Sequence, residues 1–142
     1  MATIRHITKD DYSMGHLELY KQLTYINPEK IDQYTYEQFI DKLNDRHMIF
    51  VLIDQGKIVG SATIFIEEKL IRDISKVAHI EDVVIDKNCR GMGYGKMIID
   101  YLVNIAKNNN CYKVILDCDI NNQIFYEKCG LLLKGCQMCK YF

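Results

Sequence analysis

Three glycines within five residues, Gly91, Gly93 and Gly95, stand out in a chain that contains only eight glycines. They follow a strand-like run and open a helix-like run, so their backbone amides can converge on one concave site at a helix N-terminus. Free amides and the helix dipole at such a position bind anionic oxygens. Arg90 and Lys96 flank the glycines and add positive charge. This spacing predicts a site for a phosphate or pyrophosphate group.

Two familiar nucleotide-binding motifs do not match the glycine segment. A Walker A loop requires G-x-x-x-x-G-K-S/T, whereas Gly91 and Gly95 are one residue too close and Met97 follows Lys96. The dinucleotide fingerprint requires G-x-G-x-x-G, whereas the glycines here are spaced G-x-G-x-G. Spacing alone therefore leaves two interpretations open, an anion site of another kind or a glycine-rich turn that binds no ligand.

The elements that must position these residues follow from the hydrophobic pattern. Apolar runs bounded by turn residues predict strands at residues 3–8, 48–53, 58–67, 76–86, 111–119 and 131–142. Helical spacing of apolar residues predicts helices directly after Gly95 and at residues 11–26, 34–45 and 121–130. The resulting order is β-α-α-β-β-β-α-β-α-β, so we expect one mixed α/β domain over residues 1–142.

Composition excludes several classes of protein. Lys and Arg number 18 against 19 Asp and Glu, with no basic stripe, which argues against nucleic acid as a partner. No apolar run approaches the roughly 20 residues that cross a bilayer, and the first residues carry charge too early for a signal peptide. Of six cysteines only Cys136 and Cys139 have metal-ligand spacing, without a second pair, and the four histidines are scattered. We expect a soluble, cytoplasmic protein with free thiols, no metal site and no membrane contact.

The glycine segment resembles the pyrophosphate loop that binds acetyl-CoA in the GNAT superfamily of acetyltransferases. The likeness rests on residues 90–95 after a strand, on the element order, and on residues 121–130, where an Asn and a Tyr precede a glycine. It implies a single-domain GNAT fold, with a mixed, mostly antiparallel central sheet, about four flanking helices, and strands that splay at the acetyl-CoA site. The residues that it assigns to acetyl-CoA are Val83, Val84, Ile85, Arg90, Gly91, Met92, Gly93, Tyr94, Gly95, Lys96, Asn122 and Tyr126.

Four segments, HIEDVVID, RGMGYGK, NCYKVILDCD and FYEKCG, resemble in order and spacing the branch of this superfamily that acetylates D-glucosamine 6-phosphate. The resemblance implies N-acetylation of that amino sugar on the route to UDP-N-acetylglucosamine, by direct attack of the amine on the thioester. It also implies a homodimer that exchanges its last strand. The residues assigned to the sugar phosphate are Thr24, Lys69, Arg72, Glu81, Asp82, Val83, Tyr112, Lys113 and Lys140. Lys140 stands where the family usually has an arginine, and it lacks arginine's bidentate fork.

The predicted chemistry needs only a weak base. An amino-sugar ammonium has a pKa nearer ~7.7–8.0 than ~10.4, so its deprotonation at pH 7 costs about 1–1.4 kcal/mol. Glu81, directly or through a water, is the candidate base. Strand alternation predicts that Glu81 and Asp82 point to opposite faces and do not act as a pair. The resemblance implies that Asp117 orients the amine. The alternative for Glu81 is a polar edge position or a buried ion pair. The alternative for Asp117 is a helix cap, a role that suits Asp119 better.

Tyr126 is the candidate acid, because a phenol can protonate or hydrogen-bond a departing thiolate. Full transfer from a phenol of pKa ~10 to a thiol of pKa ~8.5 runs about 2 kcal/mol uphill, so stabilisation of the thiolate is the predicted role. Asn122 lies one turn earlier on the same helix face. With ten tyrosines in the chain, a plain core position is the alternative for Tyr126, and Phe125 is assigned to the core.

Two other functions remain compatible with the pattern. The same fold can acetylate another amine, such as a polyamine, an aminoglycoside or a protein N-terminus. A non-catalytic module can also bind acyl-CoA through the glycine segment, although it would have no need of Glu81, Asn122 and Tyr126.

Overall fold

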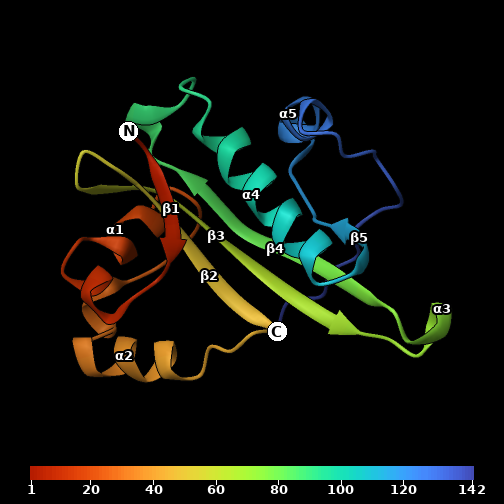
Figure 1. The fold of residues 1–142 in the computed structure, drawn as a ribbon. Coiled ribbons are helices and arrows are strands. Elements are labelled where there is room, and N and C mark those ends of the chain that lie inside the picture. The colour runs from red at the N-terminus through yellow and green to blue at the C-terminus, as the bar shows by residue number, and fades with distance from the viewer.

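A five-stranded sheet forms the centre of the computed structural model, which describes residues 1–142 (Figure 1). The strands lie side by side in chain order: β1 (Thr3–His6), β2 (His47–Asp54), β3 (Lys57–Glu68), β4 (Lys76–Ile85) and β5 (Cys111–Ile115). Neighbouring strands are antiparallel except for β4 and β5, which are parallel. The expected mixed, mostly antiparallel sheet is confirmed.

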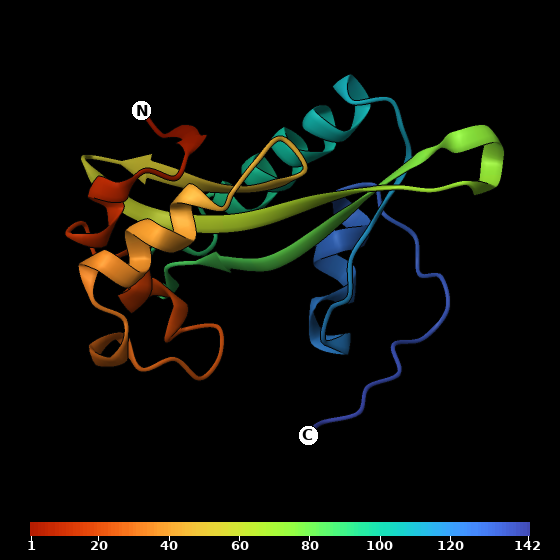
Figure 2. The same ribbon diagram turned by 90° about the horizontal axis from the view of Figure 1, so that it is seen from below.

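Helices cover both faces of this sheet (Figure 2). They are α1 (His16–Tyr20), α2 (Gln33–Asp41), α3 (Ile71–Ile74), α4 (Tyr94–Asn108) and α5 (Gln123–Lys128), with 3-10 turns η1 (Lys9–Tyr12), η2 (Pro28–Lys30), η3 (Lys87–Cys89) and η4 (Ile120–Asn122). Helix α4 packs on one face through a cluster of 11 buried apolar residues, and α1 and α2 pack on the other through a cluster of 8. No helix combines the length and apolar character needed to cross a bilayer.

Local sequence explains the two best-defined elements. The β2–β3 hairpin turns at Gln55 and Gly56, whose φ values of +48° and +74° match the turn that favours the twist of paired strands. Helix α4 buries Ile98, Leu102 and Ala106 on one stripe, as its apolar spacing predicts. Both elements were expected from the sequence and are confirmed.

The strand predicted at residues 131–142 is wrong for the isolated chain, because this segment contains no strand and β5 forms the edge of the sheet. Gly135 has a φ of +68° and interrupts an extended run. An apolar pattern also does not show which edge a segment pairs with, and residues 131–142 leave the edge of β5 unpaired. The large apolar side chains left exposed in the segment are Leu132, Leu133, Met138, Tyr141 and Phe142.

Several other expected elements are shorter than predicted, and two of them differ in ways that matter for the fold. The helix expected over residues 11–26 is divided into η1 and the five-residue α1, because Gly15 adopts a left-handed φ of +83° directly before α1. The strand expected over residues 111–119 ends at Ile115, where the chain turns away from β4 toward α5. That early end is what opens the sheet at the site described below.

A β-bulge at Asp82 interrupts β4. Ser61 pairs with Val84 and Thr63 pairs with Glu81, so Ala62 of β3 faces two residues of β4. Asp82 accommodates the extra residue with a φ of +51°. Before the bulge, Ile80 belongs to the apolar cluster under α4. After the bulge, Val83 and Ile85 turn toward α4, and Val84 belongs to the cluster under α1 and α2. The simple alternation expected for Glu81 and Asp82 is therefore wrong, and both side chains are exposed.

A buried polar network lies beneath this part of the sheet. His16 is 1% exposed, and its Nδ1 and Nε2 atoms lie 2.9 Å from the hydroxyls of Tyr36 and Ser61, respectively. The Tyr20 hydroxyl lies 3.3 Å from the same serine oxygen. Burial lowers the pKa of His16 to about 4, so the ring is neutral in the folded protein near neutral pH.

The buried histidine predicts a loss of stability in mild acid. The unfolded chain protonates His16 below pH ~6.5 while the folded protein does not, so the free energy of unfolding should fall by about 2 kcal/mol between pH 7 and pH 5 from this group. Urea unfolding of wild type and His16→Phe at both pH values measures the difference. An equal fall in both proteins would show that His16 does not carry the effect.

Candidate active site

The site opens where β4 and β5 diverge. The two strands pair only from Lys76 opposite Cys111 to His79 opposite Ile115, and β4 continues to Ile85 without a partner on that side. The backbone of this part of β4 is therefore free to pair with an extended ligand. The splayed strands expected from the resemblance are confirmed.

A run of free amides lies at the N-terminus of α4. None of the backbone amides from Gly91 to Lys96 has a hydrogen-bond acceptor within the protein. Gly91 and Gly93 have φ values of +81° and +83°, which turn the chain so that it enters α4 at Tyr94. The concave group of amides predicted from the glycine spacing is thus present at a helix N-terminus, where anionic oxygens bind.

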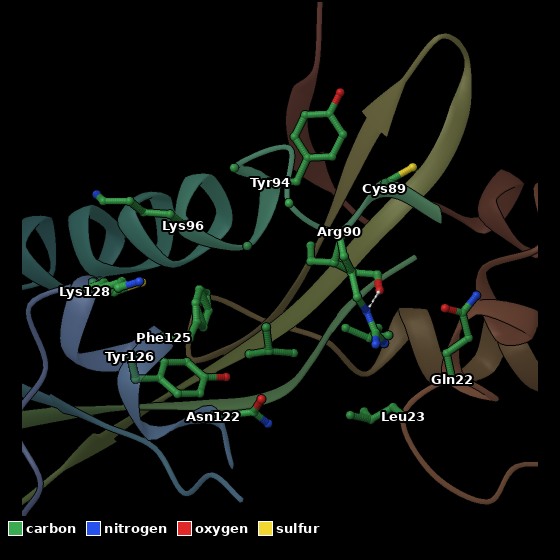
Figure 3. Close-up of a pocket in the computed structure, with 17 residues that line it drawn as sticks. Gln22, Leu23, Cys89, Arg90, Tyr94, Lys96, Asn122, Phe125, Tyr126 and Lys128 are labelled. Carbon is green, nitrogen blue, oxygen red and sulfur yellow. Dashed lines mark hydrogen bonds between the residues drawn. The ribbon is translucent and has the colours of Figure 1, made fainter. Parts of the chain in front are cut away.

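The charged and aromatic side chains around these amides point in different directions (Figure 3). Arg90 Nε donates to the carbonyl oxygen of Ile85 at 3.3 Å, which holds the guanidinium beside the end of β4. Lys96 is directed along α4 and pairs with Asp100. Tyr94 turns away from the cavity, and its hydroxyl donates to the carboxylate of Asp54 at 2.7 Å. Lys96 and Tyr94 can therefore serve the site through their amides rather than through their side chains.

Close packing of α5 against α4 depends on Gly95. A Cβ atom at this position would lie 2.9 Å from Cζ of Phe125, closer than real Cβ atoms approach. The absent side chain lets the Phe125 ring pack on the first turn of α4 and brings the neighbouring Tyr126 to the cavity. Phe125 is half-buried in the core, as expected, yet it also lines the cavity.

The cavity between these elements has a volume of about 610 Å³. It contains every residue that the resemblance assigns to acetyl-CoA except Met92, which is 58% exposed and lies outside it. The lining residues that the sequence did not assign to the coenzyme are Gln22, Leu23, Cys89, Phe125, Lys128 and Cys129. Gln22 accepts a hydrogen bond from the Lys87 amide at 2.8 Å, and no local sequence signal identifies a contact across 65 residues.

Tyr126 lies between this cavity and a second one of about 640 Å³, which it also lines. Burial raises the pKa of its phenol to about 12, and the neighbouring Cys118 and Cys129 thiols add to the rise. The phenol is therefore neutral at physiological pH and acts as a hydrogen-bond donor. Asn122 lies one turn earlier and points into the cavity beside Tyr126 (Figure 3).

Three carboxylates, those of Glu81, Asp82 and Asp117, lie near one another where β4 and β5 diverge. The pKa of Glu81 is raised by partial burial first and then by the negative charges of Asp82 and Asp117. Asp117 lines the second cavity and accepts a hydrogen bond from Gln137 at 3.0 Å. Asp119, and not Asp117, caps the following 3-10 turn, since its carboxylate accepts from the Asn121 amide at 2.8 Å. Such a cluster attracts a cation and offers a carboxylate able to accept a proton.

Part of the predicted sugar-phosphate set comes together at the β3–β4 arm, which projects from the sheet (Figure 2). Arg72, in the left-handed turn α3 at the tip of this arm, lies 4.8 Å from the ring of Tyr112 on β5. Lys113 Nζ lies 5.5 Å from the same ring. Lys69 is instead paired with Glu67 at 3.2 Å.

Two further members of the set, Lys140 and Thr24, lie apart from this group. Lys140 lies 6.0 Å from the ring of Phe142 near the C-terminus, which lies away from α3 at the tip of the arm in both ribbon views (Figures 1 and 2). Thr24 is exposed and follows Leu23, which lines the first cavity. All six cysteines are free thiols, and no group of three or more His, Cys, Asp or Glu residues is arranged to hold a metal ion.

Comparison with known proteins agrees with this geometry. Residues 2–131 match the model of the acetyltransferase (GNAT) family. The glucosamine 6-phosphate N-acetyltransferase of Arabidopsis thaliana is 41% identical over 144 residues, covering 98% of this chain and 95% of the relative. Glucosamine 6-phosphate N-acetyltransferase 1 of Dictyostelium discoideum is 38% identical over 147 residues, covering 98% of this chain and 90% of the relative.

Solved structures show the same relationship. The crystal structure of glucosamine-6-phosphate N-acetyltransferase from Arabidopsis thaliana superposes with a TM-score of 0.95 at 37% identity, covering 100% of this chain and 99% of that one. An aminoglycoside acetyltransferase from a soil metagenome, solved with sisomicin, superposes with a TM-score of 0.78 at 17% identity over 99% of this chain and 95% of that one. This second likeness shows a shared fold alone.

The free amides predict a specific effect of Gly93→Ala on binding of acetyl-CoA, the ligand that the resemblance implies. An added Cβ meets no atom within 4 Å, but the left-handed φ of +83° costs an L-residue about 1–2 kcal/mol. Relaxation of that strain should displace the amides and raise the Kd for acetyl-CoA about tenfold. Isothermal titration calorimetry measures the change.

Gly56→Ala is the matched control for this experiment. Gly56 has a similar φ of +74° and equal free space, but it lies in the β2–β3 turn outside the cavity. It should lose similar stability and keep the wild-type Kd. Equal Kd values in both variants would refute the role of the Gly93 region in anion binding.

Proposed function

The chain belongs to the acetyltransferase (GNAT) family, and we propose that it acetylates the amino group of D-glucosamine 6-phosphate. The acetyl donor is acetyl-CoA, the cosubstrate of this family, and the product is N-acetyl-D-glucosamine 6-phosphate, on the route to UDP-N-acetylglucosamine. One observation carries the proposal: the free amides of residues 91–96 and a cluster of three carboxylates flank the same opening between β4 and β5. The relatives that match 98% of the chain under this enzyme's name support it.

The residues of the first cavity fit acetyl-CoA. The amides of residues 91–96 can hold the pyrophosphate, with Arg90 as the nearest guanidinium. The unpaired edge of β4 at Val83–Ile85 can hydrogen-bond the amide groups of the pantetheine arm. Acetyl-CoA supplies an acetyl thioester that an amine can attack directly, so no cysteine nucleophile is required.

Three carboxylates account for the handling of the amine. Glu81, Asp82 and Asp117 together attract the ammonium form of the substrate, which dominates at neutral pH. The raised pKa of Glu81 brings its proton affinity closer to that of the amine and makes it the preferred proton acceptor of the three. The bulge supports this assignment, because it exposes Glu81 and Asp82 together instead of burying one of them.

Tyr126 acts as a hydrogen-bond donor to the thiolate rather than as a full acid. With a pKa of about 12, transfer of its proton to a thiolate of ordinary pKa would run about 5 kcal/mol uphill. A hydrogen bond from a neutral phenol to a charged sulfur contributes about 1.5–3 kcal/mol without that cost. The position of Tyr126 between the two cavities supports this role.

The sugar phosphate is assigned to the cationic group on the β3–β4 arm and β5. Arg72 and Lys113 lie on the ring of Tyr112, and the salt-bridged Lys69 directly follows β3 at the start of the loop that contains α3. Thr24 follows the cavity-lining Leu23 and is assigned to the same substrate. A small phosphorylated amine fits this combination of carboxylates and separate cations better than an uncharged sugar or a polyamine.

We further propose that the enzyme is a homodimer in which the C-terminal segment covers β5 of the partner, with Lys140 serving the partner's phosphate site. The outer edge of β5 has no paired strand. Residues 131–137 wall the second cavity beside it, and Leu132, Leu133 and Met138 remain exposed in one chain. The proposal treats residues 1–142 as one N-acetyltransferase domain and places it in the cytoplasm, whose reducing conditions suit six free thiols.

The reaction is tested by measuring coenzyme A release from acetyl-CoA with catalytic amounts of enzyme. Glucosamine 6-phosphate should support turnover, whereas unphosphorylated glucosamine and spermidine should not, because they lack the anion that Arg72 and Lys113 are assigned to bind. Turnover with spermidine or glucosamine alone would reassign the substrate. Acetyl-CoA binding without turnover on any amine would favour a non-catalytic module.

Tyr126→Phe provides the internal control for that assay. Loss of one hydrogen bond to a charged group should lower kcat by about 10- to 100-fold. The Kd for acetyl-CoA should stay at the wild-type value, because the amides and β4 are unchanged. A normal kcat would remove Tyr126 from the mechanism while leaving the substrate assignment intact.

Sedimentation equilibrium tests the dimer. The full chain should sediment at twice its 16.6 kDa mass. Leu133→Asp places a charge on the exposed apolar segment and should shift the protein toward the monomer, since a buried unpaired charge is costly. A wild-type monomer at the enzyme concentrations used for assay would contradict this part of the proposal.

A further inference from the structure

A hydrogen-bonded pair, His79 and Glu67, lies beside the carboxylate cluster and has no part in the proposed reaction. His79 Nε2 on β4 lies 2.9 Å from Oε1 of Glu67 on β3. Lys69 Nζ lies 3.2 Å from the same oxygen. Because an ionised carboxylate only accepts hydrogen bonds, Nε2 of His79 must carry the proton of this contact. Glu67 therefore sets the orientation of the imidazole ring.

Strand geometry places this ring next to Glu81. His79 and Glu81 are two residues apart on β4 and precede the bulge, so their side chains share one face, about 7 Å apart along the strand. Ile80 between them is buried on the opposite face under α4. The pairing of β3 with β4 then brings Glu67, which lies diagonally across from His79, to the outer side of that ring.

Apart from His79, the charged groups that face Glu81 are both negative. Asp82 adjoins it on β4, Asp117 faces it from the segment after β5, and the β3 residue opposite is the uncharged Thr63. His79 is the one neighbour that favours the ionised form of Glu81. The neighbours of His79 itself are Glu67 and the ring of Phe65 on β3, and Ile115 on β5.

We propose that His79, oriented by Glu67, is a positioning residue that keeps Glu81 ionised among the other carboxylates and so ready to accept the proton of the substrate ammonium. This inference rests on the proposed function, in which Glu81 is the proton acceptor. It extends that proposal by adding a pair of residues that touch no substrate atom.

A purely structural role for the pair predicts a different result. The side chains of His79 and Glu67 are 28% and 39% exposed, and an ion pair at this exposure contributes little to stability. Backbone pairing already joins β3 to β4 over most of their length. A structural pair would therefore change the thermal midpoint slightly and leave the pH dependence of catalysis unchanged.

The test measures kcat against pH for wild type, His79→Gln, Glu67→Gln and His79→Arg. Loss of the imidazole, which favours the ionised form of Glu81, or of its orientation by Glu67, should move the acidic limb upward by about half a pH unit in the two Gln variants. His79→Arg places a permanent cation at this position and should hold the limb at or below the wild-type position. Unchanged limbs in both Gln variants would overturn the proposal.

Glu68→Gln is the matched control. Glu68 is the next residue on β3 and forms an exposed ion pair with Arg46 at 3.0 Å. Its neutralisation removes a carboxylate of similar exposure that does not contact His79, so the pH profile should stay in place. A shift as large as that of Glu67→Gln would show that general surface charge, and not the His79 pair, controls the limb.

A direct titration separates this inference from the substrate assignment. Carboxyl resonances of protein labelled with ¹³C-glutamate, with Glu81→Gln for assignment, report the midpoint of Glu81 without any amine present. A higher midpoint in His79→Gln supports the inference even if glucosamine 6-phosphate proves not to be the substrate. An unchanged midpoint refutes it even if that sugar is acetylated rapidly.

Discussion

The bulge at Asp82 is the constraint on which the rest of the site depends. One extra residue opposite Ala62 reverses which side of the sheet each later residue of β4 faces. Val84 can then fill the core under α1 and α2, while Val83 and Ile85 turn toward the cavity. In a strand without the bulge, either Glu81 and Asp82 or the cavity-lining Val83 and Ile85 would lie on the wrong face of the sheet. The cost is a non-glycine residue at a φ of +51°, of the kind that persists at functional sites.

The divergence of β4 and β5 turns this local irregularity into a site. Once β5 ends at Ile115, the edge of β4 and the amides at the start of α4 border one opening. Its two flanks differ in electrostatic character: unpaired N–H groups favour anionic oxygens, and three carboxylates favour an ammonium group. The amides thus attract the pyrophosphate of a coenzyme to one side of the opening. The carboxylates attract the amine of an acceptor to the other side. Tyr126 lines the cavity beside the free amides and also the second cavity, which Asp117 lines.

Sequence patterns predicted most of the fold because they reflect local chemistry. The β2–β3 hairpin, the amphipathic α4 and the glycine turn before it depend on residues close together in the chain. The failures have the opposite origin. The final strand did not form, because residues 131–142 do not pair with the free edge of β5, and a regular alternation of Glu81 and Asp82 was interrupted by the bulged pairing with β3. Met92 lies within the motif yet outside the cavity, because a motif specifies a backbone path and not the direction of every side chain.

The sequence by itself determined the residue types and the backbone freedom of the site: glycines able to adopt left-handed φ, acidic residues within strands, and a tyrosine one turn after Asn122. Only the tertiary structure decided which of these groups meet. It brought Asp117 close enough to Glu81 for their charges to interact, turned Tyr94 toward Asp54, and placed His79 between Glu67 and Glu81. The physical reason is that pKa values and hydrogen bonds depend on distances of a few ångströms between distant segments. Those distances are set by strand register and helix packing, which no local pattern specifies.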